Sequence, residues 1–277
     1  MIQLPNHIIP DENTIDRLKI YQDEIDALAT FELKSKKAKD IFPTRNRIGN
    51  AVFDAIKMKL TEMCSGARRC VYCEDSVGDE VEHIRPKDLY PGSCFLWNNY
   101  VYACGNCNAP KNNKFAVFKT VDGTFHEVNP PKGTPASEPP DGLDAMINPR
   151  IENPLEYCML DLASTFKFVI IKPVGTNDAQ KAHYTFNEVL RLNEREFLRK
   201  ARENAYINYK SRLGYYNSEK SKGVDQTKLN TLISNLKQEA HPTVWKEIQR
   251  QHTMDILKKI DVDLNNLLIQ SPEALTW

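Results

Sequence analysis

Two short cysteine pairs constrain this chain more than any other feature. The first is "CVYC", with Cys70 and Cys73, and the second is "CGNC", with Cys104 and Cys107. Two intervening residues let both sulfurs of a pair turn toward one ion, so two such pairs can close a tetrahedral thiolate site for zinc. A redox role is not expected, because no βαβ pattern surrounds either pair. A zinc ion with four thiolate ligands has no open position, so we expect it to stabilise the fold rather than to catalyse.

The remaining composition is that of an ordinary globular protein. The chain has 277 residues, of which 41% are hydrophobic and 27% are charged, and its formal net charge is zero. A nucleic-acid partner would therefore have to bind a local basic patch. The sequence contains no run of about 18 apolar residues and begins without a basic flank and apolar core, so it predicts neither a membrane span nor a secretory signal. We expect a cytoplasmic protein whose seven cysteines are thiols or metal ligands rather than disulfides.

Hydrophobic periodicity divides the chain into four regions and predicts an α+β, predominantly helical fold. Apolar residues at helical spacing predict a helical region at 1–65, and cysteine pairs, turns and a β-type run distinguish a core at 66–120. A proline-rich loop and the strand-like run "TFKFVIIKP" occupy 121–175, and a second helical region fills 176–277. Within the first region, "KSKKAKDIFPTRNR" is expected to be either a solvated linker between helices or an edge that contacts phosphates.

A second ordered set of residues lies between the cysteine pairs. A β-type run carries Glu82 and His83 and is followed by Ile84 and Pro86, Asn99 stands five residues before the second pair, and a polar residue and a lysine follow that pair. From Cys70 to Phe115 this order resembles the HNH endonuclease family. That family is built on a ββα-metal core, so the resemblance implies a hairpin, one catalytic metal ion and a following helix. Here that zinc-stapled core would be embedded between the two helical regions.

The resemblance also implies the roles of single residues. A histidine with a near-neutral pKa is suited to taking a proton from water, and the resemblance puts His83 in that role. It makes Glu82 a ligand of the catalytic ion and Asn99 the brace of the loop that orients the histidine. Asn108 stands where many members carry a last histidine, and we expect it to be the second ligand, with Asn112 as the alternative. Such oxygen ligands favour magnesium or manganese.

One geometric condition applies to this assignment. In a regular strand, the neighbouring residues Glu82 and His83 face opposite sides. Both can serve one ion only if the strand bends or ends there, and Pro86, three residues after His83, makes an end plausible.

Several basic side chains are candidate nucleic-acid contacts. Lys111 and Lys114 are expected at the start of the helix that follows the second cysteine pair, and Arg85 and Lys87 follow the histidine. Such side chains bind phosphates, although exposed lysines are as often simply solvated. The arginine-rich segment "RLNEREFLRKAR" is a further candidate for contact with a nucleic-acid backbone or for docking a partner.

The segments outside the core narrow the resemblance. With "INPRIENPLEY" and "LRLNEREFLRKAR", the chain is similar to the HNH subunit of Septu-type anti-phage systems, the PtuB-like nucleases. This implies an endonuclease that hydrolyses phosphodiester bonds, with DNA as substrate and little sequence specificity. It also implies a separate ATPase partner, because this chain has no GxxxxGK[ST] loop. Two other interpretations are an HNH-type RNase and a non-catalytic zinc-knuckle module that binds nucleic acid or protein.

Overall fold

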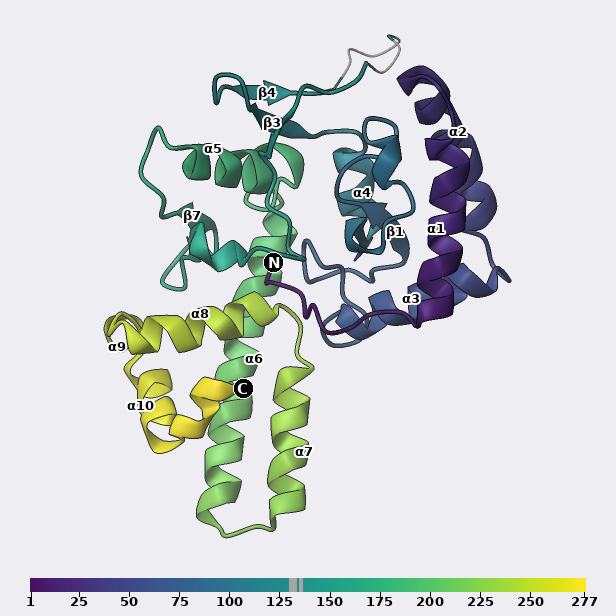
Figure 1. The fold of residues 1–277 in the computed structure, drawn as a ribbon. Coiled ribbons are helices and arrows are strands. Elements are labelled where there is room, and N and C mark those ends of the chain that lie inside the picture. Colours follow the sequence, from purple (N-terminus) through teal and green to yellow (C-terminus); the bar gives the residue numbers. More distant parts are fainter. Residues whose placement is uncertain (130–133, 135–136) are drawn as a thin grey trace.

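The structure, a computed structural model, describes residues 1–129, 134 and 137–277 (Figure 1). It is α+β, with many helices around small antiparallel sheets of two or three strands, as the sequence predicts. The proline-rich loop expected within 121–175 lies partly outside the described residues. None of the described helices combines the length and the apolar character needed to cross a membrane.

The first helical region contains three helices, each of which begins at a polar capping residue. They are α1 (Glu12–Asp26), α2 (Phe31–Arg45) and α3 (Ala51–Met63). The side chains of Asp11, Thr30 and Asn50 accept hydrogen bonds from backbone N–H groups of the first turns of these helices. Such caps satisfy N–H groups that have no partner inside the helix.

The basic segment expected to be a linker is part of helix α2. The residues "KSKKAKD" lie in its middle, where Ala38, Ile41 and Phe42 form a buried face. The linker interpretation is therefore wrong. The high lysine content favoured a linker, but Ala38, Ile41 and Phe42 are at helical spacing and pack the helix onto the core.

A short hairpin and a helix form the centre of the molecule. The elements are β1 (Glu80–His83), the 3₁₀ turns η1 (Pro91–Ser93) and η2 (Trp97–Asn99), β2 (Tyr100–Ala103) and α4 (Gly105–Lys111). The two strands are antiparallel, with His83 opposite Tyr100 and Glu82 opposite Val101. Within residues 1–129, 134 and 137–277 the sheet has these two strands, so the outer edge of β1 has no strand partner there.

Both faces of this hairpin are covered. Val81, Tyr100 and Tyr102 belong to one hydrophobic cluster with the buried residues of α1, α2 and α3. Val101 and Ala103, on the other face, belong to a second cluster that includes the four paired cysteines and much of the C-terminal half. The alternation of a strand thus places His83 toward the N-terminal helices and Glu82 toward the other core.

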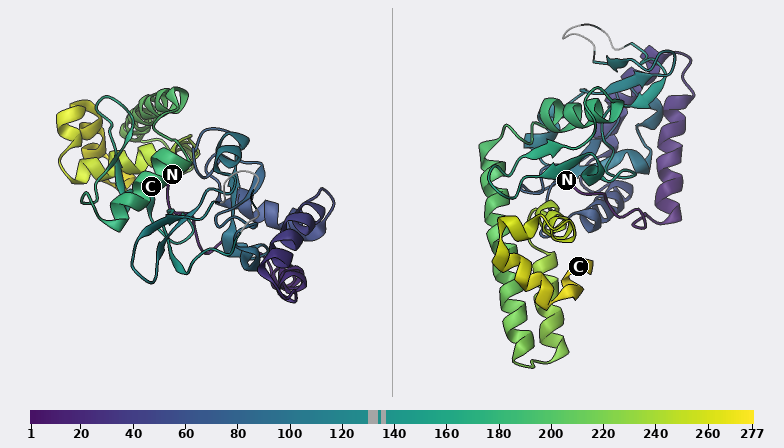
Figure 2. Two further views of the ribbon diagram at one scale, coloured as in Figure 1. Left: turned by 90° about the horizontal axis from the view of Figure 1, so that it is seen from above. Right: turned by 90° about the vertical axis from the view of Figure 1, so that its left-hand side faces the viewer.

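The rest of the chain forms two further sheets and a set of helices. A three-stranded sheet has the order β4 (Phe125–Glu127), β3 (Ala116–Lys119), β5 (Gly142–Asp144), and after the turn η3 (Pro154–Glu156) a hairpin pairs β6 (Cys158–Leu160) with β7 (Phe168–Ile170). The helices are α5 (Asn177–His183), the π-helical η4 (Tyr184–Val189), α6 (Glu196–Ser221), α7 (Gln226–Lys237), α8 (Pro242–Thr253), α9 (Leu257–Ile260), α10 (Val262–Gln270) and the 3₁₀ turn η5 (Pro272–Thr276). The α6–α7 hairpin extends away from the body of the molecule (Figures 1 and 2).

Candidate functional site

The four paired cysteines form one buried cluster. One ligand atom from each of Cys70, Cys73, Cys104 and Cys107 lies within 4.8 Å of all the others. The sulfurs of Cys73 and Cys104 are 3.8 Å apart, and a tetrahedral zinc site with bonds of about 2.3 Å has sulfur–sulfur edges of about 3.8 Å. The cluster can therefore hold a metal ion such as zinc, as the spacing predicts.

A guanidinium group from the C-terminal half contacts this cluster. Both terminal nitrogens of Arg195 lie 3.4 Å from the Cys107 sulfur, and one also donates to the Leu190 carbonyl. Its positive charge would offset part of the negative charge of the thiolates. Arg195 belongs to the arginine-rich segment expected to face a nucleic acid or a partner, so the sequence did not predict this contact.

His83 is the last residue of β1 and is held by a backbone carbonyl. Its Nε2 lies 2.9 Å from the carbonyl oxygen of Cys94. Because a carbonyl can only accept, Nε2 carries the proton and Nδ1 has the free lone pair. The pKa of His83 is lowered to about 3, mainly by burial and then by the positive charge of Lys87. The ring of Phe42 packs against the imidazole with 4.4 Å between centroids.

A cavity of about 320 Å³ runs along the free edge of β1. Its lining residues come from β1, from the loop after it, from α2 and from the end of α4: Phe42, Glu80, Val81, Glu82, His83, Pro86, Lys87, Asn108, Ala109, Asn112 and Asn113. Glu80, Val81, Glu82 and His83 are four consecutive residues of this lining. β1 ends at His83, and both Glu82 and His83 line this one cavity, but their side chains leave the strand on opposite faces.

Glu82 has an internal counter-ion that the sequence did not predict. The Nζ atom of Lys111 lies 2.5 Å from Oε1 of Glu82 and donates to the His83 carbonyl at 2.8 Å. Burial raises the pKa of Glu82, and the charge of Lys111 acts in the opposite direction. Lys111 is the last residue of α4 and is fully buried, rather than exposed at the start of that helix. It is therefore not a surface contact for phosphates.

Asn108 contacts a second carboxylate. Its side-chain nitrogen donates to Oε2 of Glu80 at 2.6 Å. Glu80 precedes Glu82 by two residues and so lies on the same face of β1, a relation that strand alternation alone could have revealed. Asn112 lines the same cavity and is exposed. The cavity thus gathers two carboxylates and amide groups, the oxygen donors that magnesium and manganese prefer.

Asn99 connects the segment after His83 to the turn that carries Cys94. Its side-chain oxygen accepts from the backbone N–H of Arg85 at 2.8 Å, and its nitrogen donates to the carbonyls of Arg85 and Ser93, both at 3.0 Å. The side chain is buried. These bonds join the two segments that hold the imidazole.

The other predicted basic residues have different surroundings. Arg85 makes a bidentate contact with Asp144 of β5, with its closest distance 2.7 Å, so its charge is already matched. Lys87 lines the histidine cavity, with its ammonium 3.4 Å from Asp88. Lys114 is exposed and follows α4.

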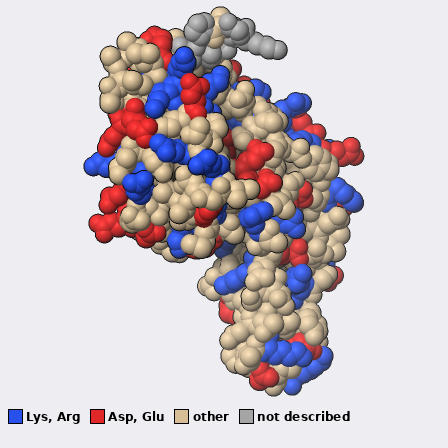
Figure 3. Space-filling view, turned by 90° about the vertical axis from the view of Figure 1, so that its right-hand side faces the viewer, with Lys and Arg blue, Asp and Glu red and all other residues tan. Residues whose placement is uncertain are grey.

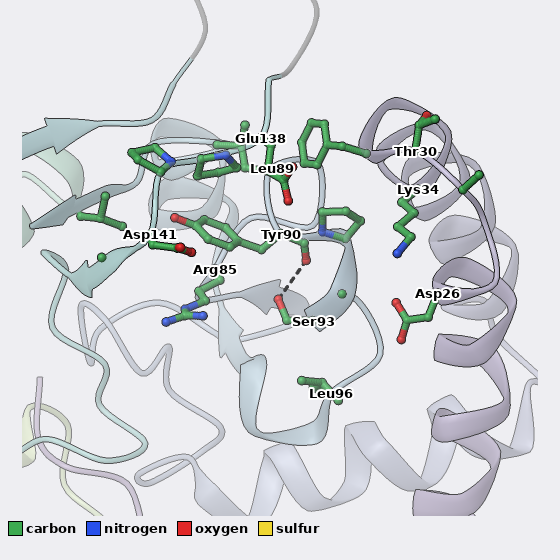
Figure 4. A pocket seen from close by; sticks show the side chains of 18 residues that line it. Asp26, Thr30, Lys34, Arg85, Leu89, Tyr90, Ser93, Leu96, Glu138 and Asp141 are labelled. Carbon is green, nitrogen blue, oxygen red and sulfur yellow. Dashed lines mark hydrogen bonds between the residues drawn. The ribbon is translucent and has the colours of Figure 1, made fainter. Parts of the chain in front are cut away.

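A larger cavity of about 600 Å³ lies on the other side of the loop that follows His83 (Figure 4). Arg85 and Tyr90 line it together with Ser93, whose hydroxyl donates to the Tyr90 carbonyl at 2.9 Å. Acidic residues such as Asp26 and basic residues such as Lys34 both contribute, so this cavity has no single-sign character that would select an anion or a cation.

The fold and the site define an α+β protein in which a four-cysteine cluster adjoins a cavity with a histidine and carboxylates. Among curated proteins, the chain is similar to Septu protein PtuB of Bacillus thuringiensis, with 33% identity over 96 residues, which is 32% of this chain and 34% of that protein. The match thus spans about a third of the length of that relative. No protein-family model matches the chain, and neither does any solved structure.

Proposed function

We propose that this chain is a metal-dependent endonuclease of the HNH type, with a zinc-stapled core and its reaction centre in the cavity along β1. The observation that carries the proposal is the state of His83, a neutral imidazole fixed by a carbonyl at Nε2 on the wall of a cavity rich in oxygen ligands. A base must be unprotonated before it can take a proton, and this histidine is unprotonated at neutral pH. Its pKa of about 3 lies below the near-neutral value expected from the sequence, so burial also makes the imidazole a weaker base.

The chain's own groups divide the work of phosphodiester hydrolysis. His83 takes the proton of the attacking water at Nδ1, while the Cys94 carbonyl keeps the ring in one tautomer. Asn99 keeps the two segments around the ring in place through its bonds to Arg85 and Ser93. Lys87, at the mouth of the cavity, provides positive charge near the phosphate.

The residues along β1 fit a catalytic magnesium or manganese ion by their chemistry. Glu82 and Asn108 are the ligands we propose, and Glu80, which is bonded to Asn108, adds a carboxylate beside them. When bound, the ion would stabilise negative charge on the phosphate oxygens during hydrolysis. Asn112, on the same wall, is the alternative to Asn108.

We propose DNA as the substrate and anti-phage defence as the role. The similarity to a Septu protein supports the defence role, and the net charge of zero agrees with recognition by a local basic patch rather than by the whole surface. The resemblance also supports a separate ATPase polypeptide as partner. The simplest supporting observation would be a gene for an ATPase next to the gene for this chain.

The catalytic proposal is tested by replacing the histidine. Purified protein is incubated with supercoiled plasmid and magnesium or manganese, with and without the candidate ATPase. We expect His83→Ala to lower the rate of nicking by about 10²–10⁴-fold, because that is the usual contribution of a general base. His183→Ala is the matched control, since His183 is an exposed histidine that pairs with Glu188 outside the cavity, and it should cleave like the wild type.

Two outcomes would contradict the proposal. If the wild type and His83→Ala cleave plasmid equally, or if both are inert under every condition, His83 is not a catalytic base for DNA. The same pair of proteins incubated with structured RNA distinguishes the substrate, because an RNase would lose RNA cleavage on His83→Ala and leave DNA intact.

A further inference from the structure

Helix α2 carries its basic residues on two flanks with different surroundings. On one flank, Lys37 and Arg45 face α1 and lie 3.4 Å and 2.9 Å from the carboxylate of Glu24. On the other flank, Lys36 and Lys39 are exposed and take part in no ion pair among the described residues. The helix thus has one flank whose basic residues are paired with Glu24, and another on which the exposed Lys36 and Lys39 stand beside the exposed carboxylates of Glu32 and Asp40.

The flank with Lys36 and Lys39 borders the histidine cavity. Ser35, Lys39 and Phe42 are spaced four and three residues apart, so they share one side of the helix. The Ser35 hydroxyl donates to the Asp88 carbonyl at 2.6 Å, and the Phe42 ring lies 4.4 Å from the His83 ring. Lys39 is exposed on this same side of the helix, one turn before Phe42, which lines the cavity.

Two further lysines stand at the same mouth on other elements. Lys87 comes from the loop after β1, and its charge is close enough to lower the pKa of His83. Lys114 is exposed just beyond the lining residues Asn112 and Asn113 at the end of α4. Asn113 also donates to Asp88 at 3.1 Å, which ties this segment to the loop that α2 contacts.

The surface around this mouth is not basic as a whole. On the face where α1 and α2 lie, Lys and Arg alternate with Asp and Glu (Figure 3). The acidic groups near the rim are Glu80, which is bonded to Asn108, and Asp88, whose oxygens contact Asn113 and Lys87, together with the exposed Glu32 and Asp40 of α2. The rim is therefore mixed in charge, and Lys36, Lys39 and Lys114 are its lysines that take part in no ion pair among the described residues.

We infer that Lys36 and Lys39 of α2, with Lys87 and Lys114, form a rim that binds the backbone phosphates of a nucleic acid on both sides of the histidine cavity. This deepens the proposed function and rests on it, since it makes a helix outside the ββα core part of the substrate site. Lysines that face solvent from separate elements around one cavity suit a polyanion whose charges are repeated along its length.

The test measures binding and does not require cleavage. The full chain carrying His83→Ala is titrated against a fluorescein-labelled 30-base-pair DNA duplex at several KCl concentrations, and fluorescence anisotropy gives Kd. We expect Lys36→Gln with Lys39→Gln to raise Kd by about tenfold and to reduce the slope of log K against log salt by about 1.8, because each lost phosphate contact contributes about 0.9. Lys87→Gln with Lys114→Gln should have an effect of the same kind.

The matched control removes two positive charges from the other side of the helical region. Lys19→Gln with Lys37→Gln changes the net charge equally and should leave Kd within about twofold and the salt slope unchanged. The inference is overturned if Lys19→Gln with Lys37→Gln weakens binding as much as Lys36→Gln with Lys39→Gln. It is also overturned if Lys36→Gln with Lys39→Gln leaves Kd and the salt slope unchanged. If binding follows this pattern but the wild type does not cleave DNA, the proposed nuclease activity is refuted, while the proposed phosphate-binding lysines are still supported.

Discussion

At the scale of single residues, the pair of Glu82 and Lys111 joins the structure of the core to the proposed site. Lys111 is buried and contacts both the carboxylate of Glu82 and the carbonyl of His83, so it holds two neighbouring residues of the proposed reaction centre. The CxxCxxxK spacing is local and easy to recognise, but it does not reveal where the lysine points. Its burial depends on how α4 packs on β1, which is a contact between residues far apart in the sequence.

The ion pair of Glu82 and Lys111 leads to a prediction about the stability of the fold. Lys111→Met should lower the free energy of unfolding by about 3–5 kcal/mol, because it leaves a buried carboxylate without its partner. Glu82→Gln combined with Lys111→Met should recover at least half of that loss, since neither charge then remains. Urea unfolding followed by circular dichroism measures both. Lys114→Met, a change at an exposed lysine nearby, should stay within about 0.5 kcal/mol. A loss below about 1 kcal/mol for Lys111→Met would show that the ion pair is unimportant.

At the scale of elements, the sequence predicted best what depends on local spacing. The cysteine pairs, the helical regions and the short strand at Glu82 and His83 follow from periods of two to four residues, and the structure contains each of them. The contacts of Glu80, Cys94 and Arg195 depend on distant segments that meet only in the folded chain, so a single sequence shows no sign of them.

The cysteine cluster provides the prediction at this scale. Cys104→Ser should remove zinc from the purified protein and lower its Tm by about 10 °C, since a loss of about 4 kcal/mol shifts a chain of this size by that amount. Zinc content is measured by elemental analysis and Tm by calorimetry. Cys64→Ser is the matched control, because Cys64 is a half-buried thiol outside the cluster. A Cys104→Ser protein with full zinc and an unchanged Tm would exclude the structural metal.

At the scale of the whole molecule, the residue that follows the first cysteine pair connects the cysteine cluster to the C-terminal helices. Glu74 is buried, and its carboxylate accepts from the backbone N–H of Thr243 at 3.1 Å and from the Thr243 hydroxyl at 2.7 Å. The amino group of Met1 also lies 2.9 Å from this carboxylate. Because Thr243 is in the first turn of α8, Glu74 satisfies one N–H group of that turn and complements the positive end of the helix.

This connection predicts that metal removal loosens a helix distant from it in the sequence. Cys73 and Glu74 are neighbours, so we expect the position of Glu74 to depend in part on an ion that holds the turn of the first cysteine pair. Treating zinc-loaded protein with a chelator should speed amide hydrogen exchange in the first turns of α8 by about tenfold, which corresponds to about 1.4 kcal/mol of local stability. Glu74→Gln should produce a smaller increase with zinc still bound. The turn between α6 and α7, far from α4 in Figure 1, should exchange at an unchanged rate in both experiments, because α4 contains Cys107 of the cluster. If α8 keeps its protection after zinc is removed, the helix is held by its own packing and Glu74 transmits nothing from the metal.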